Sequence, residues 1–103
     1  MRHAVVLALT CSAFWIGAAH AQAGDTAAGR AVAQLYCTAC HGEVTRPDQR
    51  APAFATIASE RARTNAEMTT WLLDPHPPMP DVRLSIPEIR DVILYIRSLA
   101  PPR

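Results

Sequence analysis

The sequence predicts an all-α fold of three to four short helices, because two helix-start motifs are present and apolar residues follow at helical spacing. The tetrads TNAE (64–67) and SIPE (85–88) are capping boxes, in which the first and fourth residues bond to each other's backbone amides. Apolar residues then recur at Ile89, Val92, Ile93, Ile96 and Leu99. No convincing alternating pattern of a β-strand appears, so we expect helices alone.

Three helical stretches are expected in order along the chain. The first covers 25–36, where an aspartate stands at the N-cap position. The second covers 64–74 and the third 85–100, and a proline directly follows each of them. Residues 42–63 and 74–84 are predicted to be loops with short turns.

Residues 1–23 have the layout of a secretory signal peptide. A positive start is followed by an apolar run over 4–19, and small residues mark cleavage after Ala21 or Ala23. We therefore expect a single exported domain at 24–103, located in the periplasm and without a membrane span once the signal is removed. An uncleaved membrane anchor is the alternative, although the apolar run is short for a span.

The composition after the signal excludes several classes of protein. Every basic residue is an arginine, and beyond Arg2 the arginines balance the nine acidic residues, so no nucleic-acid-binding stripe is expected. A domain of this size gains only marginal stability from its apolar core. Cys37 and Cys40 are the two cysteines beyond the signal, which excludes a disulfide framework. A large cofactor is therefore expected to complete the core.

The five residues CTACH (37–41) indicate covalent attachment of a haem. Cys37 and Cys40 are spaced to form thioethers with the two vinyl groups of one haem c, and His41 is placed to bind its iron. A thioredoxin-like redox pair is an alternative, but a helix rather than a strand is predicted before the motif. A zinc site would need further ligands, and an unused pair of reduced thiols is the remaining possibility.

The stretch PHPPMP (75–80) suggests the ligand on the other face of the haem. Met79 offers a soft thioether sulfur, and the prolines around it restrict the backbone, which lowers the entropy cost of holding it on the iron. The alternative role for Met79 is a core methionine that fills a gap. His76 is the rival ligand, and otherwise it would lie at the surface beside the haem edge.

Four further residues are candidates for supporting roles near the haem. Trp71 and Tyr95 are expected to pack in the core or to donate hydrogen bonds to a haem propionate, rather than to relay electrons. Arg46 and Arg50 could each pair with a propionate, and the sequence does not choose between them.

Taken together, the chain resembles the small bacterial class I (mitochondrial-type) cytochromes c. CTACHG matches the attachment site of that family and PPMP its distal loop, while EIRDVILYIRSL is similar to its terminal helix. The resemblance implies that Pro52 accepts a hydrogen bond from the His41 imidazole, and that Gly29 allows the first and last helices to cross closely. Ala33 departs from the family's aromatic, and we expect Leu35 or Tyr36 to compensate.

The resemblance implies a cytochrome c fold around one haem and a carrier of single electrons, not an enzyme, with His41 and Met79 on the iron. Expected partners are redox proteins: a dehydrogenase, an oxidase or a membrane quinol-oxidising complex. The chain would act as a monomer or as a subunit of a complex. Two alternatives stay open: a fixed haem subunit of a periplasmic dehydrogenase or oxidase, and a five-coordinate haem that binds a gas or reduces peroxide.

Overall fold

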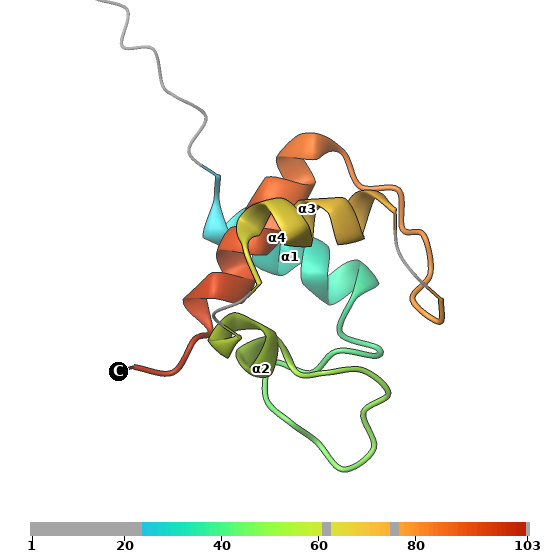
Figure 1. Ribbon diagram of the computed structural model, residues 1–103, viewed down its shortest axis with the longest axis vertical. Helices are drawn as coiled ribbons and strands as arrows, with labels where there is room; N and C mark the ends of the chain where they lie inside the picture. The colour runs from blue at the N-terminus through green and yellow to red at the C-terminus, as the bar shows by residue number, and fades with distance from the viewer. Residues whose placement is uncertain (1–23, 61–62, 75–76, 103) are drawn as a thin grey trace, which may run out of the picture.

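The computed structural model describes residues 24–60, 63–74 and 77–102, and within them the secondary structure is entirely helical (Figure 1). The four helices are α1 (Thr26–Tyr36), α2 (Phe54–Ser59), α3 (Asn65–Leu73) and α4 (Ile86–Ser98). Helix α4 packs against each of the other three and crosses α1 most extensively. The all-α prediction is therefore confirmed, with α4 as the central element.

Local side-chain signals explain where three of these helices begin. The Asp25 carboxylate accepts hydrogen bonds from the first-turn amides of α1. Both predicted capping boxes form, with Thr64 and Glu67 at the start of α3 and with Ser85 and Glu88 at the start of α4. These caps satisfy backbone N–H groups that have no partner inside a helix.

Helix α2 lies inside the stretch that was predicted to be a loop, so that part of the prediction was wrong. The helix has six residues, and no side chain caps its N-terminus. Its first amides are instead satisfied from a distance, because Phe54 donates to the Gly42 carbonyl (2.8 Å) and Ala55 donates to the Glu43 carbonyl (3.0 Å).

The crossing of α1 and α4 depends on Gly29, as the resemblance implied. A Cβ added to Gly29 would come within 1.9 Å of the Asp91 carbonyl oxygen, so the two backbones approach as closely as glycine permits. Ala33 is fully buried one turn later. Leu35 and Tyr36 are 75% and 52% exposed, so the expectation that either fills the place of an aromatic was wrong.

The core lies between α4 and the three helices around it. Its buried members are Ala33, Cys37, Phe54, Met68, Ile89, Val92, Ile93, Tyr95 and Ile96. The segment after α1 and the segment between α3 and α4 both extend to the right of α4 in Figure 1, and these two segments carry the predicted haem ligands.

Candidate functional site

The two cysteines and the histidine of CTACH lie on one tight turn at the end of α1. Cys37 is the C-cap of the helix, and its amide donates to the Ala33 carbonyl at 2.8 Å. The amides of Cys40 and His41 both donate to the Cys37 carbonyl, at 3.1 and 2.9 Å. The motif therefore continues the helix into a hydrogen-bonded turn that carries both cysteines and the histidine.

Cys37 and Cys40 are not joined in a disulfide, and their surroundings differ. Cys37 is buried and Cys40 is partly exposed. Burial raises the pKa of the Cys37 thiol, which keeps it protonated at neutral pH. A redox-active pair of the thioredoxin kind needs the opposite shift, because the thiolate is the reactive species.

The His41 imidazole is oriented through one of its two nitrogens. Nδ1 lies 2.7 Å from the Pro52 carbonyl oxygen. A carbonyl can only accept, so Nδ1 carries the proton, and the neutral ring keeps its lone pair on Nε2. Within the described part of the chain Nε2 has no hydrogen-bond partner, which leaves it available to a metal.

Phe54 holds the plane of the same imidazole. The two rings are stacked, with centroids 5.4 Å apart and an interplanar angle of 11°. Phe54 is buried at 2% exposure, and its backbone N–H donates a hydrogen bond to the carbonyl of Gly42, the residue that follows His41. The histidine is therefore fixed in direction by Pro52 and in tilt by Phe54.

Tyr95 reaches this site from α4. Its ring meets Phe54 edge to face, with centroids 6.1 Å apart, and its hydroxyl donates to Glu43 Oε1. Burial, with the Glu43 carboxylate second, raises the pKa of Tyr95 to about 12, so the hydroxyl remains a donor. Tyr95 is thus a core residue in the structure, and its hydroxyl is already bonded to Glu43.

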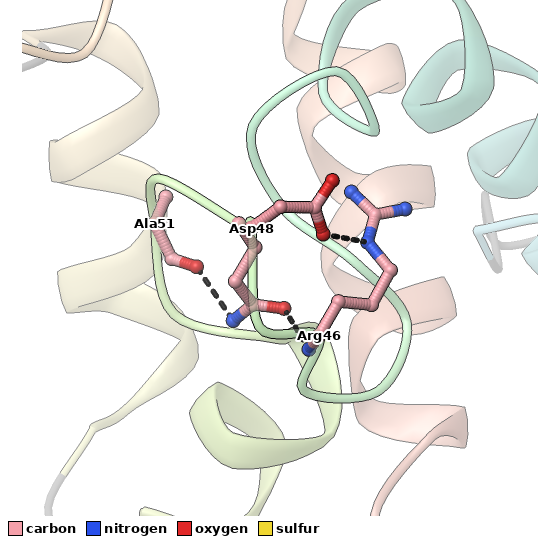
Figure 2. Close-up of polar contacts among 4 residues, drawn as sticks. Arg46, Asp48 and Ala51 are labelled. Carbon is pink, nitrogen blue, oxygen red and sulfur yellow. Dashed lines mark hydrogen bonds and ion pairs between the residues drawn. The ribbon is translucent and has the colours of Figure 1, made fainter.

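The loop between the attachment turn and α2 is closed by polar contacts, three of which are drawn in Figure 2. Arg46 Nε lies 3.8 Å from Asp48 Oδ1. The Gln49 amide accepts from the Arg46 N–H and donates to the Ala51 carbonyl, each at 2.8 Å. Arg46 and Arg50 are both exposed, and within the described part of the chain no hydrogen bond or ion pair joins either of them to His41.

The predicted distal ligand lies in the segment before α4. Met79 is partly buried, whereas the prolines on either side of it are exposed. Asp81 stabilises the following turn by accepting from the Arg83 amide at 2.9 Å. The rival ligand His76 lies outside the described residues.

Trp71 lies on α3. The guanidinium of Arg63 lies 4.1 Å from the centre of its ring, a cation–π arrangement, and the side chain is 43% exposed. Of the two aromatic residues considered for a supporting role, the structure brings Tyr95 into the neighbourhood of His41 and places Trp71 beside Arg63.

The side chains at this site suit a metal ion whose cofactor supplies most of its ligands. Over 24–60, 63–74 and 77–102, no group of three or more His, Cys, Asp or Glu side chains gathers as a protein-built metal site would require. Two unpaired cysteines three positions apart, followed directly by a histidine whose Nε2 has no partner among the described residues, are what a covalently attached haem needs from one side. The fold and the site therefore define a c-type haem protein.

Comparison with known proteins agrees with this class. The model of the family "Cytochrome c" matches residues 26–100, and the chain belongs to that family. Cytochrome c-552 of Bradyrhizobium diazoefficiens is 35% identical over 85 residues, which cover 79% of this chain and 81% of that protein. No match to a solved structure was found. The chain is accordingly a haem electron carrier, its cofactor is a covalently bound haem c with its iron, and its partners are redox proteins.

Three residues around His41 were not among those predicted from the sequence: Glu43, Gln49 and Phe54. Phe54 stands two positions after Pro52, and an apolar residue at that place could have suggested contact with the histidine. Glu43 meets a residue 52 positions away, and no local pattern predicts that contact. Gln49 bonds to the backbone of its own loop, and its residue type alone does not predict such a contact.

Proposed function

We propose that this chain is a periplasmic carrier of single electrons, with haem attached at Cys37 and Cys40 and its iron held by His41 and Met79. The observation that carries the proposal is the 2.7 Å contact between His41 Nδ1 and the Pro52 carbonyl. It sets the tautomer with a free Nε2 and raises the donor strength of the ring. Haem supplies the one-electron chemistry by alternating between Fe(II) and Fe(III).

Met79 is the proposed sixth ligand. Its thioether is neutral and soft, favours ferrous over ferric iron, and so suits a carrier of raised potential. The prolines at 77, 78 and 80 reduce the entropy that ordering the side chain would cost. Met68 is buried in the core on α3, so it is accounted for by packing. Two protein ligands on the iron favour outer-sphere electron transfer and disfavour binding of a substrate.

Export and maturation complete the proposal. Residues 1–23 would act as a cleaved signal, and the domain would consist of 24–103. Helix α1, with its N-cap at Asp25, lies wholly after both proposed cleavage sites, so cleavage at either site would leave this helix intact. None of the helices in the described ranges has the length and apolar character needed to cross a bilayer.

The decisive experiment is an optical spectrum of the protein expressed in the periplasm, recorded in the ferric form and in the ferrous form with and without carbon monoxide. We expect a six-coordinate ferrous haem that ignores carbon monoxide, and a weak far-red sulfur-to-iron band in the ferric form. Met79→Ala should lose that band and bind carbon monoxide readily. Met68→Leu, a volume-conserving change in the core, is the matched control and should keep the band.

Other outcomes distinguish the alternatives. If His76→Ala abolishes six-coordination and Met79→Ala does not, the iron has two histidine ligands. Carbon monoxide binding to the unaltered protein indicates an open, five-coordinate haem. Purification from the native source with a larger subunit indicates a fixed subunit, and N-terminal sequencing of the periplasmic form tests cleavage after Ala21 or Ala23.

A further inference from the structure

The side chain of Gln49 spans the loop that follows the attachment turn. Its Oε1 accepts from the Arg46 amide and its Nε2 donates to the Ala51 carbonyl, both at 2.8 Å. The oxygen and the nitrogen of the neutral Gln49 side chain are therefore both hydrogen-bonded to backbone groups (Figure 2). Gln49 is partly buried, while Arg46 and Asp48, on the same loop, are exposed.

The hydrogen bond from Gln49 to the Ala51 carbonyl orients the Ala51–Pro52 peptide. Pro52 has no N–H, so the Ala51 carbonyl is the single hydrogen-bonding group of the Ala51–Pro52 peptide. That carbonyl accepts from Gln49 Nε2. The Ala51 amide on the other side donates to the Cys40 carbonyl at 3.3 Å, so Ala51 is held from both sides.

The ring of Pro52 makes the direction of the Pro52 carbonyl depend on the orientation of the Ala51–Pro52 peptide. The ring fixes the φ angle of Pro52, so once the Ala51–Pro52 peptide plane is set, one soft torsion decides where the Pro52 carbonyl points. That torsion is limited from the far side, because Phe54 donates to the Gly42 carbonyl at 2.8 Å. The Pro52 carbonyl is thereby aimed at His41 Nδ1.

Gln49 also packs against the residue next to His41. A Cβ added to Gly42 would lie 3.1 Å from Gln49 Oε1 and 2.6 Å from the Val44 carbonyl oxygen. The amide of Gln49 therefore occupies space that glycine leaves open beside the histidine. The loop contacts His41 through two of its neighbours, Gly42 in sequence and Pro52 in space.

We propose that Gln49 is a positioning residue for the haem centre: it fixes the Ala51–Pro52 peptide, and through it the strength of the hydrogen bond from His41 to Pro52. The inference rests on the proposed function in that His41 is taken as the iron ligand. A strong bond from Nδ1 makes the imidazole a better donor and stabilises ferric iron. Removing the Gln49 anchor should therefore weaken the bond and raise the midpoint potential.

Two variants of the holoprotein test this role. Gln49→Met keeps the length of the side chain but can neither accept from Arg46 nor donate to Ala51. Gln49→Glu keeps the acceptor and loses the donor, so it isolates the bond to Ala51. Asp48→Asn is the control, because it disturbs the exposed pair with Arg46 on the same loop and leaves Gln49 in place.

The readouts are the hydrogen-exchange rate of the His41 Nδ1 proton, measured by NMR on the ferrous form, and the midpoint potential. We expect exchange to accelerate about fivefold in Gln49→Met and in Gln49→Glu, the factor that corresponds to the loss of one hydrogen bond of ordinary strength. The potential should rise in Gln49→Met. It is not compared for Gln49→Glu, because the added charge acts on the potential by itself. Asp48→Asn should leave the exchange rate unchanged.

An intact six-coordinate holoprotein whose exchange rate is unchanged in Gln49→Glu would overturn the positioning role and leave the carrier proposal standing. If Gln49→Met fails to fold, the result for Gln49→Glu decides, because that variant also removes the hydrogen bond to Ala51. Unaltered protein that lacks covalent haem, or whose histidine is off the iron, would overturn the inference together with the proposed function.

Discussion

The Tyr95 hydroxyl on α4 donates a hydrogen bond to the carboxylate of Glu43, two residues beyond His41. Phe54 lies against both rings, stacked on His41 and edge-on to Tyr95. The Glu43 carbonyl in turn accepts from the first turn of α2. The central helix therefore holds the histidine through an aromatic contact and holds the segment after it through a polar one.

Replacing Tyr95 with phenylalanine should destabilise the protein by about 1 kcal/mol, the usual net value of one hydrogen bond, because the ring contacts remain and the bond to Glu43 is lost. Glu43 is exposed, so water can replace the lost donor and limits the cost. The measurement is urea unfolding of the holoprotein. Tyr36→Phe, at an exposed position on α1, is the control and should leave the free energy of unfolding almost unchanged.

The stability of the folded protein should fall at alkaline pH through Tyr95. Its folded pKa is raised from 10.0 to about 12, chiefly by burial. The folded state therefore keeps the proton after the unfolded chain has released it, and stability is full below the unfolded pKa and is lost between about pH 10 and pH 12. Unfolding free energies across this range should decline less steeply in Tyr95→Phe. An equal slope in the two proteins would contradict the assignment.

Gly29→Ala should destabilise the crossing of α1 and α4, although alanine is the better helix former by about 1 kcal/mol. The added Cβ would meet backbone atoms of Asp91 at 1.9 and 2.3 Å, which cannot rotate away, so the helices must separate. A net loss of about 1–3 kcal/mol, the range typical of overpacking, is expected in urea unfolding.

Gly24→Ala serves as the matched control for this change. There the nearest atom is a side-chain methyl, Leu94 Cδ1, at 2.4 Å, and a leucine can shift its rotamer. Its cost should be clearly smaller than that of Gly29→Ala. Equal costs would mean that the close approach at Gly29 does not determine how α1 and α4 pack.

The helices that could be predicted are those whose start signals lie within a few residues. Asp25, Thr64 and Ser85 each cap the turn that follows them, and such short-range bonds can be read from the sequence. Helix α2 could not be predicted in this way, because its first amides bond to carbonyls of Gly42 and Glu43, 12 residues earlier in the chain. Only the folded loop brings those partners together.

The candidate site divides along the same line. The attachment chemistry of Cys37, Cys40 and His41 is contained in five consecutive residues, so the motif alone predicts it. The partner of His41 at Pro52 could be expected only from the family resemblance, since it lies 11 positions away. Contacts that depend on packing, such as the stacking of Phe54 on His41, could not be predicted from the sequence. The role of Met79 stays a prediction.

The capping box of α4 should contribute to stability only while its glutamate is ionised. Hydrogen bonds from the Ser85 side chain and then from its backbone lower the pKa of Glu88. A carboxylate with a depressed folded pKa stabilises the protein above its unfolded pKa, and that contribution is lost as the pH falls through the folded value. Glu88→Gln should therefore be less stable than the unaltered protein near pH 7, and the difference should shrink as the pH falls below 4.5, the ordinary pKa of a glutamate.

The second box gives an internal check on this prediction. The pKa of Glu67 is also lowered, first by the Thr64 backbone amide and then by the Thr64 side chain, so Glu67→Gln should repeat the same pH-dependent loss on α3. The two boxes lie on different helices and share no residue, so their effects should add in the double variant. Urea unfolding of the four proteins across this pH range measures both points. A stability difference that is the same at both ends of the range would show that the ionised carboxylates do not act through the caps.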